Sequence, residues 1–469
     1  MVSRHLATLL VALALAGCTT VGPNYKLPPE AVVNTPAANG AFVSGSAVTA
    51  AEAPPDHWWK LFNDPVLDRL IERALAANTD LRAADANLER AQALLGEARG
   101  GRQIDPSVDA SVSYVQQSAE SYLQHVQPPE RTIYNAGVGV SYDLDLFGGL
   151  RRGIEAAGAE EEAAVAARDL VRVNVAAETA RAYADLCNAG NQIAVTNQLL
   201  ALQGEDLRLT RELITHGRSP QFEGERQQTA IQSTQARLPQ LGARQRNAAF
   251  RIATLMGQPP AAFDRSLLAC RTPLTLPTLL PVGNGQSLLK RRPDVRAAER
   301  RLAAATARIG VATAALYPDI RLSASVGSQG RATDLLSPLT NRFGVGPLIS
   351  WDLRRSVVRA RIAEANADTK ARLASFDGTV LTALREVETA LDNYAADLDR
   401  LKQLDAARQT AAAVAARTQE LRRGGKVGGL VALDAERGRI AAEEAVAVAE
   451  ADTNADQVAV FLALGGGWS

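Results

Sequence analysis

Two long stretches without proline most constrain what this 469-residue chain can fold into. They run from Leu150 to Thr215 and from Leu353 to Gly424, and both are rich in Ala, Glu, Arg and Leu. Proline costs about 3 kcal/mol inside a helix, so its absence permits continuous helices there. At about 1.5 Å per residue, each helix would reach roughly 100 Å. Because that is too long for one compact globule, we expect each to pack along other long helices.

The chain also contains a second copy of its own pattern. Asp80-Leu81-Arg82 returns as Asp294-Val295-Arg296, and Tyr142-Asp143-Leu144 returns as Trp351-Asp352-Leu353. The order of these segments is preserved at a long and nearly constant offset. We therefore expect a duplicated domain half rather than a solenoid of short repeats.

Each half is predicted to form a helix, two strands, a long helix and a return helix. The first half spans 57–257, the second spans 287–469, and a connector (equatorial region) rich in Pro and Leu covers 258–286. The predicted elements of the first half are a helix at about 66–100, strands at about 106–118 and 132–146, a long helix at about 150–215 and a return helix at about 222–256. Those of the second half are a first helix, strands at about 318–328 and 342–353, a long helix at about 355–423 and a return helix at about 430–464.

The predicted strands alternate apolar and polar side chains. In the first strand, Val108, Ala110 and Val112 alternate with Ser107 and Asp109. At about 10 to 13 residues each strand can cross a bilayer when tilted, and the small or charged partners suit a water-filled lumen. A soluble sandwich with one wet face is the alternative. Four strands cannot close a barrel and lipid does not tolerate an open sheet edge, so strands in a membrane require further copies of the chain.

The first residues indicate a bacterial lipoprotein signal. Arg4 precedes an apolar run, Leu6 to Leu15, that is too short to span a bilayer as a helix. The small residues before Cys18 resemble the lipobox, in which the cysteine thiol receives a diacylglyceryl group, the chain is cut before the cysteine, and the new amine is acylated. An ordinary signal peptide with a chance cysteine is the alternative.

This interpretation predicts a signal peptide at 1–17 and a lipidated tether, rich in Ala, Pro and Gly, at 18–56. No cofactor is expected beyond the covalent diacylglyceryl and acyl groups on Cys18, and several acyl chains on one residue suffice for stable anchoring. Thr19 stands where Asp would signal retention in the inner membrane. We therefore expect a protein anchored by lipid to the outer membrane, with a large periplasmic part.

Composition argues against several classes of function. The 51 basic residues balance the 51 acidic residues, so no nucleic-acid partner is implied. The four histidines are scattered and no Ser/His/Asp set stands out, so we expect neither a metal site nor an enzyme. Apart from Cys18, the chain has Cys187 and Cys270. Two cysteines do not make a disulfide framework, and whether they pair is left open.

Several motifs along the whole chain are similar to those of one family. They are Cys18 to Tyr25, Trp58-Trp59 near Phe62, Asp145 to Gly148, Arg291 to Glu299, Tyr317-Pro318 and Leu464 to Trp468. The chain thereby resembles the TolC-like outer-membrane efflux factors, specifically the NodT-like lipoproteins that serve RND-type multidrug pumps. The resemblance implies a mainly α fold with a small β part. In the implied homotrimer, three chains give twelve strands to one transmembrane β-barrel, which a long periplasmic α-helical barrel continues.

The function implied by the resemblance is the outer-membrane channel of a tripartite efflux pump. The channel would be a passive exit duct for drugs or other small molecules. Its partners would be outer-membrane lipid, a periplasmic adaptor (membrane fusion protein) and an inner-membrane RND pump that drives export. The alternatives are the exit duct of an ATP-driven protein secretion system and a pore-less periplasmic rod. The lipid anchor and the ending Gly465 to Trp468 favour the multidrug branch, and the strand pairs argue against a rod.

The resemblance also places a periplasmic gate at the second helix reversal. Leu430 would form an apolar constriction, and Asp434 would form a ring of carboxylates that repel one another and hold cations. Arg437 would pair with Asp434 at i,i+3 within the chain. The alternative to a gate is that these two residues are an ordinary surface ion pair on a helix. The remaining tip residues are Arg422, which stands where some relatives carry an aromatic Tyr, and Phe222 and Glu223 on the first reversal.

Overall fold

The computed structural model describes residues 20–44, 49–50, 52–116, 118–120, 125–277, 279–334 and 337–466. The expected signal peptide and its Cys18 lie outside these residues, as does Trp468. The chain divides into two compact units. The first, called the sheet unit, holds residues 88–164 and 298–376 together with the chain up to Pro28. The second, called the helical unit, holds residues 29–87, 165–297 and those from Asp377 onward.

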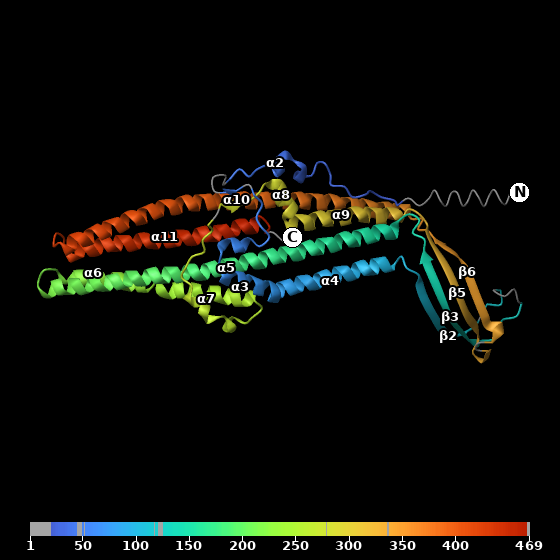
Figure 1. Cartoon of the computed structure of the whole chain (residues 1–469). Helices are drawn as coiled ribbons and strands as arrows, with labels where there is room; N and C mark the ends of the chain where they lie inside the picture. Colours follow the sequence, from blue (N-terminus) through green and yellow to red (C-terminus); the bar gives the residue numbers. More distant parts are fainter. Residues whose placement is uncertain are drawn as a thin grey trace. The chain divides into compact units, whose positions relative to one another are not determined.

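The sheet unit contains a four-stranded antiparallel sheet. Its strands β2 (Asp105–Val115), β3 (Arg131–Asp143), β5 (Asp319–Arg331) and β6 (Asn341–Ser350) lie side by side in the order β2-β3-β5-β6 (Figure 1). The strands lie where the alternation of side chains predicts them, and their ends differ from the predicted ends by a few residues.

Strand register places all the alternating apolar residues on one face of the sheet. Val108 pairs with Val138, which pairs with Val326, which in turn pairs with Phe343. These side chains are exposed, with Phe343 at 88%. The opposite face carries mainly serine, glycine and charged or amide side chains, with apolar exceptions such as Ile133 and Leu348. An antiparallel sheet with one apolar and one polar face needs a different medium on each side.

A tight turn joins β3 to the long helix α5 (Gly149–Thr215). Asp145 has a positive φ of 42°, and its carboxylate accepts hydrogen bonds from the backbone N–H groups of Leu150 at 2.9 Å and Arg151 at 3.0 Å. Gly148 also has a positive φ, 77°, which favours glycine. The motif Asp145 to Gly148 therefore ends the strand and caps the first free N–H groups of the helix.

The other elements are mainly helical. The α-helices are α2 (Pro36–Asn39), α3 (Pro65–Ala77), α4 (Thr79–Gly100), α6 (Gln221–Gln235), α7 (Leu238–Leu255), α8 (Gly285–Arg291), α9 (Pro293–Ala314), α10 (Arg355–Arg423) and α11 (Gly429–Ala463). Short 3-10 helices lie at Val32–Asn34, Trp58–Phe62, Pro260–Ala262, Arg265–Ala269, Ala332–Asp334 and Pro338–Thr340, and β1 (Thr49–Ala50) pairs in parallel with β4 (Leu280–Pro281). In the part of the chain that the structure describes, no helix is both long enough and apolar enough to cross a membrane.

Two predicted helices are each split in the structure. The segment 66–100 forms α3 and α4, because the side chain of Asn78 accepts hydrogen bonds from the N–H groups of Asp80 (2.8 Å) and Leu81 (3.1 Å) and so begins a new helix. The return helix 222–256 forms α6 and α7. Pro239 lies in the first turn of α7, where it lacks an N–H and its ring excludes a continuous helix. The matching helix α11 contains no proline and is continuous over 35 residues.

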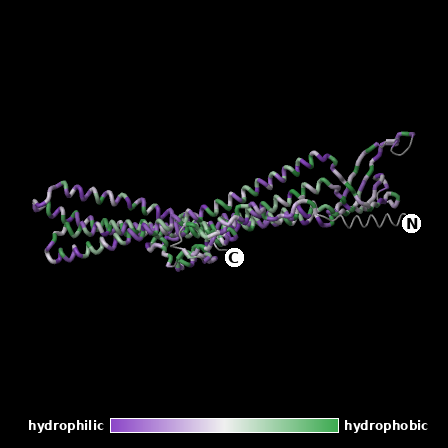
Figure 2. The backbone as a smooth tube through the Cα atoms, turned by 90° about the horizontal axis from the view of Figure 1, so that it is seen from above, coloured by the Kyte–Doolittle hydropathy of each residue, from purple (hydrophilic) through white to green (hydrophobic). Residues whose placement is uncertain are grey.

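Aromatic residues anchor the core of the helical unit. Trp58 is fully buried and stacks on Phe461 of α11 with ring centroids 4.6 Å apart. In Figure 2, hydrophobic stretches gather near the C-terminus, where the helices of this unit pack. Asp64 caps α3 through the N–H groups of Val66 and Leu67 and accepts a hydrogen bond from the hydroxyl of Tyr183 at 3.0 Å. The Trp58-Trp59 motif thus belongs to the core.

Cys187 and Cys270 form a disulfide across a sequence separation of 83 residues. Cys187 lies fully buried on α5, and Cys270 lies in the connector, so the bond joins these two segments. The backbones also approach closely, because a Cβ placed on Gly190 would lie 2.0 Å from the backbone oxygen of Cys270. The sequence left this pairing open, and the fold brings the two residues together.

Replacing both cysteines, Cys187→Ser with Cys270→Ser, should lower the free energy of unfolding by about 2 to 5 kcal/mol, because the loop that the bond closes is long. Thermal unfolding of the purified protein measures the change as a lower Tm, and reductant should lower the wild-type Tm in the same way. An equal Tm for wild type and double variant would contradict a stabilising disulfide.

Candidate functional site

The helical unit carries two helix reversals that close in the same way. At the first, between α5 and α6, the N–H of Arg218 donates to the carbonyl of Leu213 at 2.8 Å. At the second, between α10 and α11, the N–H of Lys426 donates to the carbonyl of Leu421 at 2.8 Å. Gly217 and Gly425 provide the left-handed residue in each, with φ of 68° and 67°. We call these two reversals together the tip.

The structure gathers several of the expected gate residues at one cavity. Leu430, Asp434, Arg437 and Glu223 line a cavity of about 530 Å³ at the tip. Leu430 is 43% exposed and Asp434 is exposed. Phe222 is also exposed, whereas Arg422 is only half-buried, and neither of these two lines this cavity.

Arg437 does not pair with Asp434, so the expected i,i+3 pair is wrong. Its guanidinium forms an ion pair with Asp206 of α5 and donates a hydrogen bond to the side-chain oxygen of Gln227 of α6. Asp206 is only 2% exposed, and a buried carboxylate attracts a cation more strongly than the exposed Asp434. Burial lowers the pKa of Arg437 from its usual value. Arg437 therefore ties α11 to both helices of the first reversal.

Sequence reasoning missed Asp206 and Gln227. The signal was present as a polar stripe at helical spacing on α5, where Gln203, Asp206 and Thr210 are all buried. A stripe of this kind on a long helix indicates that another helix brings polar partners to it. Recognising Arg437 as that partner requires knowing that α11 lies against α5 and α6.

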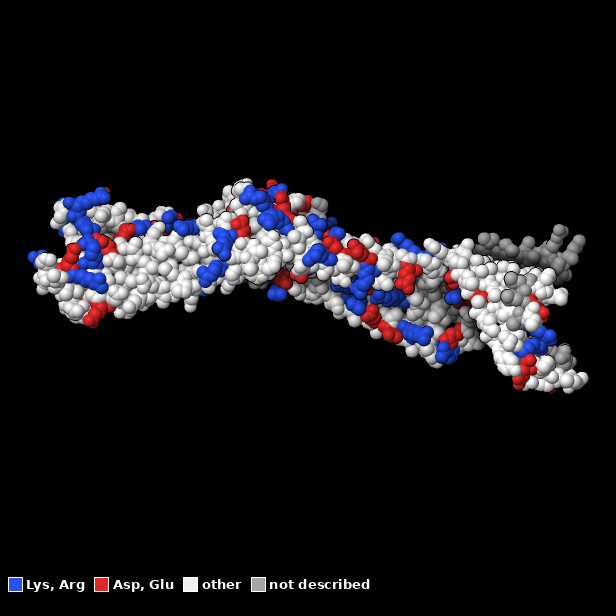
Figure 3. Space-filling model, turned by 90° about the horizontal axis from the view of Figure 1, so that it is seen from below, with Lys and Arg blue, Asp and Glu red and all other residues white. Residues whose placement is uncertain are grey.

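Basic residues surround the tip. Its turns carry Arg218, Arg422, Arg423 and Lys426. In Figure 3, Lys and Arg side chains gather at the end of the helical unit that holds the turns, at the far left of the view. The tip therefore presents positive charge outside a cavity that contains Asp434 and Glu223.

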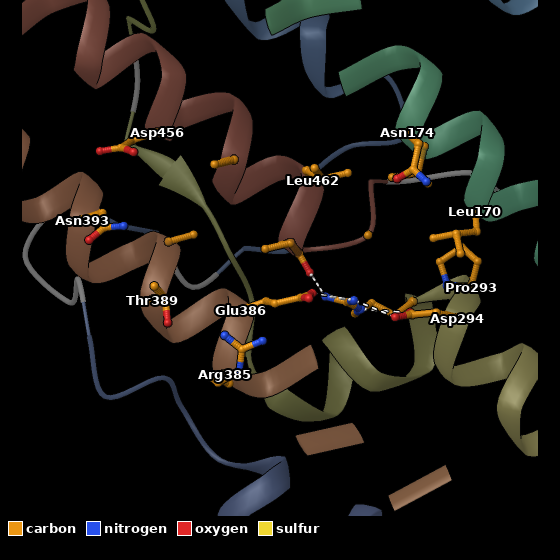
Figure 4. A pocket seen from close by; sticks show the side chains of 16 residues that line it. Leu170, Asn174, Pro293, Asp294, Arg385, Glu386, Thr389, Asn393, Asp456 and Leu462 are labelled. Atoms are coloured by element: carbon orange, nitrogen blue, oxygen red, sulfur yellow. Dashed lines mark hydrogen bonds and ion pairs between the residues drawn. The ribbon is translucent and has the colours of Figure 1, made fainter. Parts of the chain in front are cut away.

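Another cavity in the helical unit, of about 440 Å³, is lined in part by residues of the motif Arg291 to Glu299 (Figure 4). Arg292 is 7% exposed and donates to the carbonyl of Ala463 at 2.7 Å, to Asp294 at 2.6 Å and to Glu386 at 2.8 Å. It thereby provides a hydrogen-bond donor for a free carbonyl at the C-terminal end of α11 and links this helix to α9 and α10. Because all three of its guanidinium nitrogens donate within the protein, the arginine acts as a structural joint.

The same cavity contains a carboxyl group with a perturbed pKa. Burial, together with the nearby Asp397, raises the pKa of Asp456 to about 6. Among the described residues, no group of three or more His, Cys, Asp or Glu side chains is arranged to hold a metal ion.

Replacing Arg437 by Ala should leave the carboxylate of Asp206 buried without its cation. Breaking a buried pair costs about 3 to 5 kcal/mol, and because Arg437 is about a third exposed we expect roughly 1 to 3 kcal/mol. Thermal unfolding should show a lower Tm, and adding Asp206→Asn should recover part of it.

Arg439→Ala is the matched control, because among the described residues the ion pairs of Arg439 are with Glu436 and Glu443 of its own helix. Such pairs are worth about 0.2 to 0.5 kcal/mol each. Equal losses of Tm in Arg437→Ala and Arg439→Ala would refute the special role of the link from Arg437 to Asp206.

An amphipathic antiparallel sheet, together with long helices whose reversals close on a charged cavity, defines a membrane channel protein. The sequence pattern of the family described as "outer membrane efflux protein" matches residues 70–258 and 284–466. The chain belongs to this family. The predicted family, the outer-membrane location and the function as an efflux channel are thereby confirmed.

Similar proteins cover nearly the whole chain. The pyoverdine export outer membrane protein OpmQ of Pseudomonas putida is 30% identical over 99% of this chain and 98% of its own length. The probable outer membrane lipoprotein SilC of Salmonella typhimurium is 25% identical over 100% of both chains. The solved outer-membrane channel OprN has a TM-score of 0.85 and 36% identity, covering 96% of this chain and 100% of that one. These similar proteins include an export protein, an outer membrane lipoprotein and a solved channel.

Proposed function

We propose that three copies of this chain form the exit duct of a tripartite efflux pump, with twelve strands closing one transmembrane barrel. The observation that carries this proposal is the sheet itself: β2 and β6 are its two edges, and its apolar face is exposed. Open edges and exposed apolar side chains are both satisfied if copies of the sheet join edge to edge within lipid. The polar face then lines a wet lumen.

The two halves of the chain arise, in this proposal, from an internal duplication. The helices before the strands, α4 and α9, are both 22 residues long. The long helices α5 and α10 have 67 and 69 residues. Long helices from all copies would then pack side by side as a helical barrel, as lengths of roughly 100 Å require.

The partners would be a periplasmic adaptor and an inner-membrane RND pump, and the cargo would be drugs or other small molecules. Relatives that are named for efflux of such compounds support this, among them the toluene efflux pump outer membrane protein TtgC of Pseudomonas putida, 28% identical over 100% of this chain. The duct does no chemistry, and the pump supplies the energy. The basic tip offers the surface nearest to the adaptor.

The tip would be closed at rest by Leu430 and Asp434. In a trimer, one copy of each residue per chain would stand around the axis as an apolar ring and a carboxylate ring. The ion pair between Arg437 and Asp206 would hold α11 in that closed position. Arg422 supplies positive charge where an aromatic latch is absent.

Conductance of the purified protein in planar bilayers tests the duct and its gate. The wild type should show small single channels, and Asp434→Ala and Leu430→Ala should each raise the conductance several-fold because they widen the tip. Val414→Ala, which removes an exposed apolar side chain of α10 away from the tip, should leave it unchanged. A folded, membrane-extracted oligomer that never conducts would favour the pore-less rod.

The N-terminal tether supports a lipid anchor on Cys18. Arg152, 3% exposed, donates to the carbonyl of Val21 at 3.1 Å, to the carbonyl of Gly22 at 3.1 Å and to the side chain of Asn24 at 2.8 Å. The N–H of Val21 donates to the carbonyl of Phe147 at 3.1 Å, beside the end of β3. The tether is thus pinned beside the strand ends, where a membrane surface would lie in this proposal, shortly after the residue that would carry the lipid.

Cys18→Ser should abolish labelling by radioactive palmitate and slow the assembly of the trimer. Arg152→Ala should keep the label, because it leaves the lipobox intact, yet make the segment around Val21 sensitive to protease through the loss of several charged hydrogen bonds. Limited proteolysis with N-terminal sequencing detects the cut. Palmitate labelling that persists in Cys18→Ser would refute the lipid site.

A further inference from the structure

One charged network crosses the polar face of the sheet. In the strand register, Asp109 of β2 pairs with Gly137 of β3, Gly137 with Gly327 of β5, and Gly327 with Arg342 of β6. These residues form a single row in which the two charged residues stand at the outer strands and the two glycines between them. We call this the glycine row.

The side chain of Arg342 lies flat along this row. Its guanidinium donates to the side-chain oxygen of Asn135 on β3 at 2.7 Å. It also donates to the carboxylate of Asp109 at 3.2 Å on β2, the far edge strand of the sheet. The side-chain amide of Asn135 donates to the same carboxylate at 2.8 Å. The network therefore holds the side chain of Arg342 against the sheet, so that it does not point away from the polar face.

Gly137 leaves room for this position, and Gly327 allows the backbone of β3 to approach closely. A Cβ on Gly137 would lie 3.0 Å from a guanidinium nitrogen of Arg342 and 3.2 Å from a carboxylate oxygen of Asp109. On Gly327 it would lie 2.5 Å from the backbone oxygen of Ala136. Gly346, on the same face in another row, has nothing within 4 Å of a built Cβ. The space beside Gly137 is thus occupied by the side chains of Arg342 and Asp109.

The ion pair between Arg342 and Asp109 is too exposed to add much to the free energy of unfolding. The side chains of Arg342 and Asp109 are 34% and 50% exposed, and ion pairs at such positions contribute little. The pair does reduce the electric field beside the polar face, because the two opposite charges cancel each other. A second ion-paired group on this face, Arg321 with Asp143 and Asp319, lies at the C-terminal end of β3. From Gly137 to Asp143 the strand rises about 20 Å, beyond the reach of screened charge at physiological salt.

We propose that Arg342 is a selectivity-determining residue of the duct, which neutralises Asp109 on the lumen wall while leaving the lumen unobstructed. The inference rests on the proposed function, in which the polar face lines the lumen and the network is repeated once per copy. Rings of like charge at one height set the ion selectivity of a pore. Removing Arg342 would uncover a ring of carboxylates, and removing the charge of Asp109 would uncover a ring of guanidinium groups.

The test is the reversal potential of single channels under a potassium chloride gradient. It uses the Leu430→Ala, Asp434→Ala background, so that the tip does not limit the current. Arg342→Gln should raise the ratio of cation to anion permeability several-fold, and Asp109→Asn should lower it. The double variant Arg342→Gln, Asp109→Asn should return near the parent value. These shifts should be larger at about 0.1 M salt than at about 1 M, because salt screens the rings.

Gly346→Ala is the matched control and should leave the reversal potential unchanged, because it changes the same face without touching the network. Channels that conduct but keep one reversal potential in all variants would overturn the role of Arg342 and leave the duct intact. A folded oligomer of the background variant that does not conduct would overturn the duct itself, and with it this assignment.

Discussion

The register of the sheet is the constraint on which the rest of the structure depends. Side chains alternate with a period of two, so a slip of one residue would turn every apolar side chain to the polar face. The rows seen here agree across all four strands, from Val108 through Val138 and Val326 to Phe343. Because the two faces suit different media, the register supports the proposal that the sheet lies at a boundary between lipid and water. The same register aligns Asp109, two glycines and Arg342.

The helical unit is subject to a different constraint. Its long helices must be joined without leaving the buried polar backbone groups at their ends unpaired. Arg292 completes the end of α11 and ties it to its neighbours, and Asn78 begins a helix while donating to the carbonyl of Leu255 at 3.0 Å. The disulfide of Cys187 adds a covalent link to the connector. Arg292 and Asn78 supply hydrogen bonds that a helix lacks at its end, whereas the disulfide joins the middle of α5 to the connector.

Sequence reasoning succeeded where the signal is periodic and local. Alternation located the four strands, and the absence of proline located α5 and α10 with nearly correct ends. It failed where one residue acts against the surrounding pattern. Asn78 and Pro239 both interrupt segments whose composition favours one continuous helix. Of the two, Pro239 is a residue type that by itself indicates a helix boundary. Partners distant in sequence were out of reach: Arg437 was assigned to its helical neighbour Asp434 because only local spacing can be read without the fold.

The two charged networks differ in what their burial allows them to do. The carboxylate of Asp206 is buried, so separating it from Arg437 exposes a large desolvation cost and the pair resists movement. Asp109 is half exposed, so its pairing with Arg342 can break at little cost, yet the two charges still determine the field near the wall. Because it is buried, the pair of Arg437 and Asp206 is suited to holding one conformation. Because it is exposed, the pair of Arg342 and Asp109 would be able to act on passing ions. In the proposed duct, gating and ion selectivity would therefore depend on two different arginines, Arg437 and Arg342.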